Sequence, residues 1–540
     1  MKKTLLALGL ASLILFQSCE TTDDTTLLTN QDERVVLNTN TAELNARIDH
    51  SNSGVINLMS SNLTSKNLKP GDVDNFPMSL LAEMKPIVYN GKTLTATHVD
   101  VNKNYVYVSY NTTGETYLGG IDVIDISQPD NPKLVIQAIF PNTDVNTVIY
   151  ENETLYFSGG TSIDANANLK NAAFVAKMPL SGGLLTNDYL SASLQGYVST
   201  GVVIVGSDCF SVSGNNGFLS KMNKTTQEIK ASIAISDLRA IGYNENNIVV
   251  LSGTEGVKVY NAETMKLISA FNTTKDVPNA KRTLDFIEKN VLIAEGYAGV
   301  KMYDSKGSLL QTLALPTGIA NVDAADVVTN AVAVSGDYVY AANGAAGVAV
   351  YKKDNSSLIS LGSIFLGGSA NYVKSVGDYI FVANGTGGLK IVKKLSEPTN
   401  LCSTYKAYDG GQWLNVNSGQ TLNYQGSASI QGANVNQNLT FCGSLSIKQG
   451  VNINSGGVFT MRGSMAQGNF NSNSSNFNFN INGTFKVEGS VVIYGNLILN
   501  SGATLEFIGS ESSITIYGKV TKNSGVTIKG NYIDTFNKLK

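Results

Sequence analysis

Short apolar segments recur along the middle of the chain, between about residue 85 and residue 395. Seven of them, rich in β-branched and aromatic side chains, are residues 105–108, 155–157, 202–205, 248–251, 291–293, 338–340 and 379–382. They begin at intervals of 41 to 50 residues, a period typical of one four-stranded blade of a β-propeller. The pattern predicts seven blades, while the degenerate third repeat around Cys209 leaves six or eight as alternatives.

A second signature, a glycine followed by alternating apolar and polar positions, comes after several of these segments. It is found at residues 256–260, 299–303, 347–351 and 388–392. Such alternation is typical of a half-buried strand. The fullest copy, residues 120–135, adds a Ser-x-Pro-x-x-Pro turn and a further strand, and it resembles the LVIVD repeat of bacterial propeller lipoproteins. The resemblance implies a propeller fold but no particular activity, because propellers host unrelated functions.

A ring of blades leaves no long exposed edge only if its first and last parts pair with one another. Residues 85–101 precede the first apolar segment and include an alternating stretch. We expect them to lend a strand to the blade built from residues 379–392 and so to close the ring.

The sequence pattern changes after about residue 398. From there on, short alternating strands are each followed by a Ser-Gly pair. The clearest copies are residues 414–419, 451–456, 497–502 and 520–525. Spacings near twenty residues or its multiples favour the coils of a parallel β-helix, with asparagines and small residues stacked at the corners. A sandwich such as a jelly roll is the alternative.

The N-terminus begins with two lysines and an apolar run over residues 4–16 that is too short to span a bilayer, which predicts a signal peptide. Ser18 before Cys19 resembles the lipobox of bacterial lipoproteins, although Phe16 replaces the usual leucine. The resemblance implies that Cys19 is lipidated and anchors the protein to a membrane. An ordinary cleaved signal with an incidental cysteine is the alternative.

Acidic residues follow this cysteine at positions 20–24, similar to the stretch that sends Bacteroidetes lipoproteins to the outer face of the outer membrane. The resemblance implies a lipid-anchored protein at the cell surface, although acidic residues are also common in solvated tethers. The sequence thus predicts an all-β protein with four parts. They are a lipoprotein signal peptide (1–18), a tether and N-terminal segment (19–84), a seven-bladed β-propeller (85–397) and a β-solenoid-like domain (398–540).

The composition offers little for catalysis or for binding metals and nucleic acids. A net charge of −3 lacks the basic excess that nucleic acid binding needs. Zinc sites and Ser-His-Asp triads need convergent imidazoles or a paired base. The two histidines are His50, in the predicted tether, and His98, in an alternating strand, and both are interpreted as structural. We therefore predict no metal, no cofactor and no catalytic residue.

Acidic residues allow a competing reading, because glycosidases need only a pair of carboxylates. The candidates by residue type are Asp122, Asp125, Asp285, Asp323 and Asp326. Their spacing sets no two of them at a catalytic separation, and turn capping or solvation explains them more simply.

Two of the cysteines and the single tryptophan lie in the predicted C-terminal domain. Cys402 and Cys442 lie in one small domain of an exported protein, where oxidation is permitted, and we predict a disulfide between them. Two reduced thiols are the alternative, and Cys209 is taken as inert packing. Trp413 is interpreted as a core cap rather than as a platform for sugar rings.

Together these features predict a non-catalytic, outer-membrane-anchored lipoprotein that acts as a binding or adhesion scaffold for a protein or glycan at the cell surface. The alternatives are a carbohydrate-active hydrolase or lyase using loop carboxylates, and a purely structural envelope component.

Overall fold

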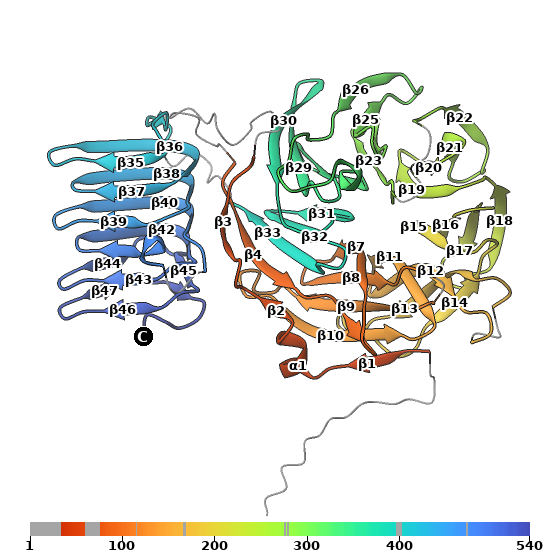
Figure 1. Cartoon of the computed structure of the whole chain (residues 1–540), viewed down its shortest axis with the longest axis horizontal. Helices are drawn as coiled ribbons and strands as arrows, with labels where there is room; N and C mark the ends of the chain where they lie inside the picture. The colour runs from red at the N-terminus through yellow and green to blue at the C-terminus, as the bar shows by residue number, and fades with distance from the viewer. Residues whose placement is uncertain are drawn as a thin grey trace, which may run out of the picture.

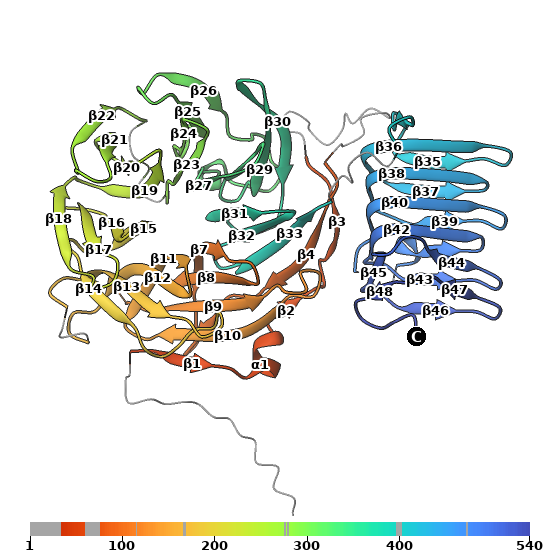
Figure 2. The same cartoon turned by 180° about the vertical axis from the view of Figure 1, so that it is seen from behind.

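The computed structural model describes residues 34–59, 76–114, 116–165, 169–274, 277, 280–395, 402–470 and 474–540. The chain forms a seven-bladed β-propeller and a parallel β-solenoid, which lie side by side in Figures 1 and 2. The predicted fold class is confirmed. Cys19 and the acidic residues 20–24 lie outside the described residues. Within the described ranges, no helix is long and apolar enough to cross a membrane.

Each blade is an antiparallel sheet whose first three strands follow one another in chain order from the axis outward. Successive first strands contact one another, and the last contacts the first, so that they surround the axis. These first strands are β7 (Thr95–Val101), β11 (Thr143–Glu151), β15 (Ser199–Val205), β19 (Leu238–Asn244), β23 (Leu284–Ile287), β27 (Ala331–Ser335) and β31 (Tyr372–Val376).

The outer strands of the blades complete the ring. The second strands are β8 (Tyr105–Asn111), β12 (Thr154–Thr161), β16 (Asp208–Ser213), β20 (Asn247–Ser252), β24 (Asn290–Ala294), β28 (Tyr338–Ala342) and β32 (Tyr379–Ala383). The third strands are β9 (Gly119–Asp125), β13 (Ala173–Pro179), β17 (Phe218–Asn223), β21 (Gly256–Asn261), β25 (Val300–Tyr303), β29 (Val348–Asp354) and β33 (Leu389–Lys394). The fourth strands of blades one to six are β10 (Lys133–Phe140), β14 (Leu190–Ser193), β18 (Ile229–Ala234), β22 (Leu267–Phe271), β26 (Leu309–Leu313) and β30 (Ser357–Ile364).

Six of the seven apolar segments seen in the sequence are second strands, which the ring buries on both faces. The exception is residues 202–205, which lie in the first strand β15. In the third blade the second strand β16 carries small polar side chains, and Ser211 is buried through hydrogen bonds to Ser199 Oγ (2.8 Å) and the Gly201 carbonyl (2.9 Å). Hydrogen-bonded hydroxyl groups interrupt the apolar run in β16. The interpretation of residues 202–205 as equivalent to the other six segments is therefore wrong, because they belong to the strand before it.

The ring is closed by β4 (Met78–Met84), which pairs antiparallel with β33 as the outer strand of the seventh blade. The expectation that residues 85–101 supply this strand is therefore wrong. Those residues form the hairpin of β5 (Val88–Tyr89) and β6 (Lys92–Thr93) and then the first strand of the first blade. All seven residues of β4 are buried, and Glu83 forms an ion pair with Lys390 (2.5 Å).

The segment before β4 is also folded onto the propeller, as Figure 1 shows. It contains β1 (Val36–Asn38), α1 (Thr41–Asn45), β2 (Ile48–Asp49) and β3 (Gly54–Ile56). Strand β1 pairs with β10, and β2 and β3 both pair with β4. Arg47 forms an ion pair with the buried Asp122 (2.6 Å). The propeller therefore includes strands that precede the predicted domain start at residue 85.

The solenoid consists of two parallel sheets whose apolar side chains meet between them. One sheet contains β34 (Lys406–Ala407), β36 (Thr421–Ile430), β38 (Asn438–Ile447), β40 (Val458–Gln467), β42 (Thr484–Ile493), β44 (Thr504–Phe507), β45 (Ser513–Ile516), β47 (Thr527–Lys529) and β48 (Ile533–Asp534). The other contains β35 (Trp413–Val416), β37 (Gly432–Val435), β39 (Val451–Ile453), β41 (Phe479–Ile481), β43 (Leu497–Leu499) and β46 (Val520–Lys522). Two short 3₁₀ helices, η1 (Ala324–Asp326) in the propeller and η2 (Ser475–Phe477) here, complete the described elements.

Asparagines stack from coil to coil, as the sequence predicts, but the longest ladder lies on a sheet rather than at a corner. Asn415, Asn434, Asn452 and Asn480 are in register on β35, β37, β39 and β41, and each amide donates to the preceding one at 2.9 Å. A corner pair, Asn454 to Asn436, is joined at 2.7 Å. Identical side chains on parallel strands lie one strand spacing apart, so the ladder satisfies polar groups along the first four strands of this sheet.

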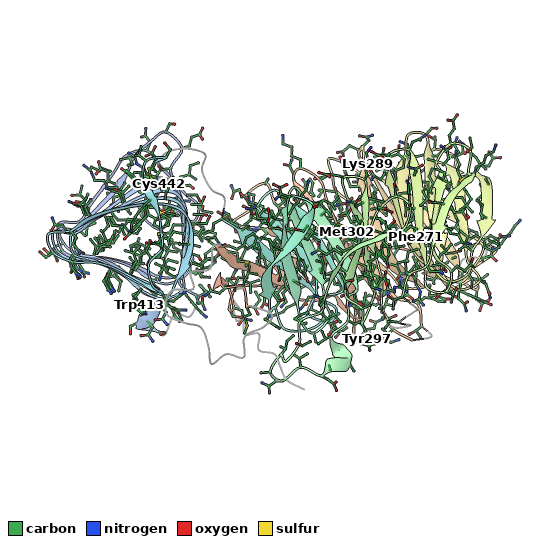
Figure 3. All side chains as sticks on the ribbon, turned by 90° about the horizontal axis from the view of Figure 1, so that it is seen from above. Phe271, Lys289, Tyr297, Met302, Trp413 and Cys442 are labelled. Carbon is green, nitrogen blue, oxygen red and sulfur yellow. A yellow bond between two sulfur atoms is a disulfide. The ribbon has the colours of Figure 1, made fainter. Side chains whose placement is uncertain are left out.

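The first coil is fixed to the rest of the solenoid by a disulfide and by a tryptophan. Cys402 and Cys442 are joined in a disulfide with their Cα atoms 6.1 Å apart, and Cys209 is free and buried. Trp413 lies over Gly432 of the next coil, where a Cβ atom would meet its ring, and 47% of its surface stays exposed. Figure 3 shows Cys442 and Trp413 at separate places on the solenoid.

The solenoid is attached to the propeller at the seventh blade. Two backbone hydrogen bonds join β3 and the residue before it to the solenoid. The Val55 amide donates to the Gly468 carbonyl (2.9 Å), and the Phe470 amide donates to the Ser53 carbonyl (2.7 Å). Tyr494 donates to Ser79 Oγ (2.9 Å) and stacks on Tyr517 with ring centroids 4.9 Å apart. Because these rings belong to a hydrophobic cluster that includes both parts, the two domains share a core.

We expect Leu81→Ala to weaken the closure of the ring. Leu81 is fully buried in β4, and removing such a side chain costs roughly 2–5 kcal/mol of unfolding free energy. Denaturant unfolding monitored by circular dichroism measures this loss. Leu267→Ala is the matched control, because Leu267 is 55% exposed and its truncation should change little. Equal stabilities of the two variants would contradict the assigned role of β4.

We expect Tyr517→Ala to separate the unfolding of the two domains. Its side chain packs on Tyr494, His50 and Phe536, and its hydroxyl donates to the Asp130 carbonyl (2.5 Å). Loss of a buried aromatic ring lowers the free energy of unfolding by about 3–5 kcal/mol. Because Tyr517 lies at the interface between the domains, this loss should weaken the contact between them. Scanning calorimetry should resolve an earlier solenoid transition, whereas Tyr197→Ala, at a tyrosine that is 65% exposed, should leave the trace unchanged.

Candidate functional site

Seven polar residues, one from each blade, surround one mouth of the axial channel. We call them the channel ring: Thr97, Asn146, Thr200, Arg239, Lys281, Asn330 and Asn371. They line a cavity of about 310 Å³. Each lies in a first strand or within the few residues before it, which is why the ring of strands brings them together from across 275 residues of sequence.

A repeated β-bulge aims the ring residues of blades one to four at the axis. The pairing of the first strand with the second shifts register there, and the unpaired residues are Thr97, Asn146, Thr200 and Arg239. A bulge inserts one residue into a strand and redirects its side chain, and bulges are common beside binding sites. In blades five to seven the first strands pair without such a shift, and the ring residue precedes the strand.

Five ring residues hold the neighbouring blade through a side-chain hydrogen bond. These donors are Thr97, Asn146, Thr200, Asn330 and Asn371, and each donates to a backbone carbonyl of the next blade around the ring. The acceptors, in the same order, are the carbonyls of Val145 (2.9 Å), Ser199 (3.3 Å), Leu238 (3.0 Å), Ala370 (3.1 Å) and Ala96 (3.5 Å). The ring therefore fixes its own polar groups in place. Thr97 Oγ1 also contacts the Ser109 carbonyl (3.1 Å) and Ser109 Oγ (2.8 Å), whereas each of the three asparagine amides keeps a second N–H donor for a ligand.

The other two ring residues, Arg239 and Lys281, are cationic. Arg239 forms an ion pair with Asp237 of its own blade (2.8 Å). Lys281 reaches across the axis, where Nζ donates to the carbonyls of Thr97 (2.5 Å) and Asn146 (3.3 Å) and lies 4.9 Å from the centre of the Tyr372 ring. Burial lowers the pKa of Lys281 to about 7, while part of its side chain stays accessible from the channel.

Beyond Lys281 the channel continues into a second cavity of about 240 Å³. His98 lies there, stacked on Tyr372 with centroids 3.9 Å apart. Burial, and then the positive charges of Lys281 and Lys374, lower the pKa of His98, so its ring is neutral. Lys374 forms an ion pair with Asp100 (3.2 Å). In this second cavity, Asp100 therefore balances the charge of Lys374, and the imidazole of His98 is uncharged.

The two histidines lie in different parts of the molecule. His50 is at the interface between the domains, 5.2 Å from the Tyr517 ring, and its Nδ1 is 3.1 Å from the Leu81 carbonyl. Burial lowers its pKa as well. Among the residues with described positions, no group of three or more His, Cys, Asp and Glu side chains is arranged to hold a metal ion.

The five acidic candidates are distributed over separate parts of the propeller. Asp122 is paired with Arg47, and Asp125 accepts from the Ser127 amide (2.7 Å). Asp323 caps η1 and Asp326 lies within it, beside Tyr297, which Figure 3 shows at the edge of the propeller. Asp285 alone lines the channel, and burial raises its pKa.

A larger cavity, of about 450 Å³, lies outside the channel between the β5–β6 hairpin and the loops of the first two blades. Tyr89, Tyr117 and Pro141 line it, and the one charged residue in its wall, Lys92, donates to Thr116 Oγ1 (3.1 Å). It lacks the convergence of polar groups from many strands that marks the channel mouth.

Sequence reasoning missed the channel ring. No single residue type is common to all its members and their spacing is irregular, so no repeat motif marks them. The available signal was their position, since six of the seven lie in or just before a strand that precedes a recognised second strand. The bulges themselves leave no trace in the pattern of apolar residues.

We expect Lys281→Met to change how stability depends on pH. Lys281 has a pKa of about 7 when folded against 10.5 in the unfolded chain, so the unfolded state binds more protons between these values. The free energy of unfolding of the wild type therefore rises with pH across that window, by at most about 1.4 kcal/mol per pH unit from this group. The stability of the variant relative to wild type should fall between pH 7 and pH 10 in denaturant titrations. Lys306→Met, at an exposed lysine of the same blade, should show a constant difference.

Comparison with known proteins identifies LVIVD repeats in the propeller. A family model described as the LVIVD repeat matches residues 95–138, 328–350 and 367–403. No curated protein matches the sequence. Among solved structures, the computationally designed Ika8 protein is 13% identical, with a TM-score of 0.37 over 57% of this chain and 99% of that one. The structure of U3-55K is also 13% identical, with a TM-score of 0.45 over 57% of this chain and 98% of that one. The chain thus carries LVIVD repeats in a seven-bladed β-propeller, which is followed by a parallel β-solenoid.

Proposed function

We propose that the protein is a lipid-anchored lipoprotein of the outer membrane that acts at the cell surface as a non-catalytic binding scaffold for a protein or glycan. The observation that carries the proposal is the channel ring, in which every blade presents a polar side chain to one cavity. Because backbone carbonyls hold five of these side chains, the ring loses little conformational freedom when it binds a ligand.

The attachment of the solenoid supports a scaffold role. The two domains share a hydrophobic cluster, so the propeller channel and the flat face of the asparagine ladder have a fixed relative orientation. A rigid body with two separate polar surfaces suits display on a membrane tether. Lipidation of Cys19 would supply that tether, since two or three acyl chains hold a protein firmly while its folded part stays in water.

A carbohydrate-active hydrolase or lyase is the second candidate, and one observation favours it. Asp285 lies in the channel with a raised pKa, as general acids in glycosidases do. Turnover of an envelope polysaccharide by the purified protein that is lost in Asp285→Asn would favour the enzyme and contradict the scaffold. Binding without turnover in both proteins would support the scaffold.

We expect the protein to be digested when intact cells are treated with protease. Surface display exposes its loops, whereas a protein on the inner leaflet of the outer membrane is protected until the cells are lysed. Immunoblotting before and after lysis measures the difference, and a periplasmic lipoprotein serves as the protected control. Cys19→Ser should release the protein from the membrane fraction. A chain that stays whole on intact cells would contradict surface display.

Binding itself is tested with a glycan array and with pull-down from envelope extracts, using the full-length protein without its lipid. Retention of one class of glycan or of one envelope protein would support the proposal. Failure to retain any component in both assays would contradict it.

A further inference from the structure

The uncompensated charge at the channel mouth belongs to Lys281. Its ammonium group is bonded to the carbonyls of Thr97 and Asn146, and among the described residues it has no carboxylate within ion-pair distance. An ammonium group has three donors, so one remains for a ligand. A half-buried cation without a counter-charge is unfavourable, and an anion from outside would supply the charge that the described residues do not offer.

The other charges near Lys281 are compensated within the protein or lie deeper. Arg239, on β19, is paired with Asp237, and Lys374, on β31, is paired with Asp100 of β7. His98 of β7 is neutral, and Tyr372 of β31 presents its ring face to the ammonium group. Asp285, on β23, lines the second cavity beyond Lys281 rather than the mouth. The mouth therefore attracts an anionic group.

The remaining lining of the mouth suits a ligand rich in hydroxyl groups. Apart from the two cations and Ala280, it consists of threonine and asparagine side chains: Thr95, Thr97, Asn111, Asn146, Thr200, Asn330 and Asn371. Hydroxyl and amide groups both donate and accept, as the hydroxyl groups of a sugar do. A cavity of about 310 Å³ lies at the lower end of the range for small-ligand pockets, and Ala280 contributes the one wholly apolar side chain among its described lining residues.

We infer that the channel mouth binds an acidic sugar, with the carboxylate of a uronic acid on the Lys281 ammonium group and the sugar hydroxyl groups on the neutral residues of the channel ring. This inference rests on the proposed binding function and names its ligand class.

The inference is tested by calorimetric titration of the full-length protein, without its lipid, with three probes at pH 6. D-glucuronate should bind at least roughly tenfold more tightly than D-glucose, which lacks the carboxylate, because a hydrogen bond to a charged group contributes that much. It should also bind at least roughly tenfold more tightly than acetate, which lacks the hydroxyl groups. Equal binding of glucuronate and glucose, or of glucuronate and acetate, would overturn the inference. Tighter binding of a peptide through its C-terminal carboxylate would overturn it too.

Two variants locate the site. Lys281→Met should weaken glucuronate binding by roughly tenfold to a hundredfold, and Lys306→Met, which removes the same charge from the surface of the same blade, should not. Unchanged affinity in Lys281→Met would overturn the assignment.

The pH dependence of the wild type gives a measurement that needs no variant to fold. Glucuronate affinity should fall as pH rises from 6 to 8.5, because Lys281 loses its proton over this range while His98 stays neutral and glucuronate stays ionised. Constant affinity over this range would overturn the role of Lys281. If glycans on the array still bind Lys281→Met as they bind the wild type, the inference fails while the proposed function stands; if no component binds either protein, both fail.

Discussion

Without β4, the third strand of the seventh blade would present a row of unpaired N–H and C=O groups at the point where the ring begins and ends. The pairing of β4 with β33 removes this edge and joins segments about 300 residues apart in sequence. The pair is buried on both sides, and its one ion pair, between Glu83 and Lys390, is itself enclosed. Every feature at the axis depends on this closure, because the first strands surround a channel only when the seventh blade meets the first.

The same strand also places the solenoid. Strands β2 and β3 pair with β4, and Ser53 and Val55, just before and within β3, form hydrogen bonds with the backbone of the solenoid. Ser79, within β4, accepts from the buried hydroxyl of Tyr494. Ring closure and domain attachment are therefore one structural unit, and a change that loosens β4 should disturb both. This arrangement explains why a short segment near the N-terminus is buried more completely than its position beside a tether suggests.

Much of the fold could be predicted from the sequence because both domains repeat a simple pattern. Buried second strands produced continuous apolar runs, and in-register coils produced recurring Ser-Gly corners. The exceptions have physical causes. Residues 202–205 were mistaken for a second strand because the true second strand, β16, alternates apolar and hydroxyl side chains and so shows no continuous apolar run. Strand β4 was missed because a closing strand belongs to no complete repeat and is paired only through contacts distant in sequence.

The channel ring was hidden from the sequence for a different reason, since a bulge changes where a side chain points without changing the composition of its strand. Its threonines and asparagines have a sufficient structural explanation, as each holds the next blade by a hydrogen bond. That explanation does not extend to Lys281. A neutral residue there could hold the next blade at no cost in buried charge, yet the chain places an ammonium group across the axis, against two carbonyl groups and the face of the Tyr372 ring. The departure from the pattern of the ring, rather than the ring itself, is what points to an anionic ligand.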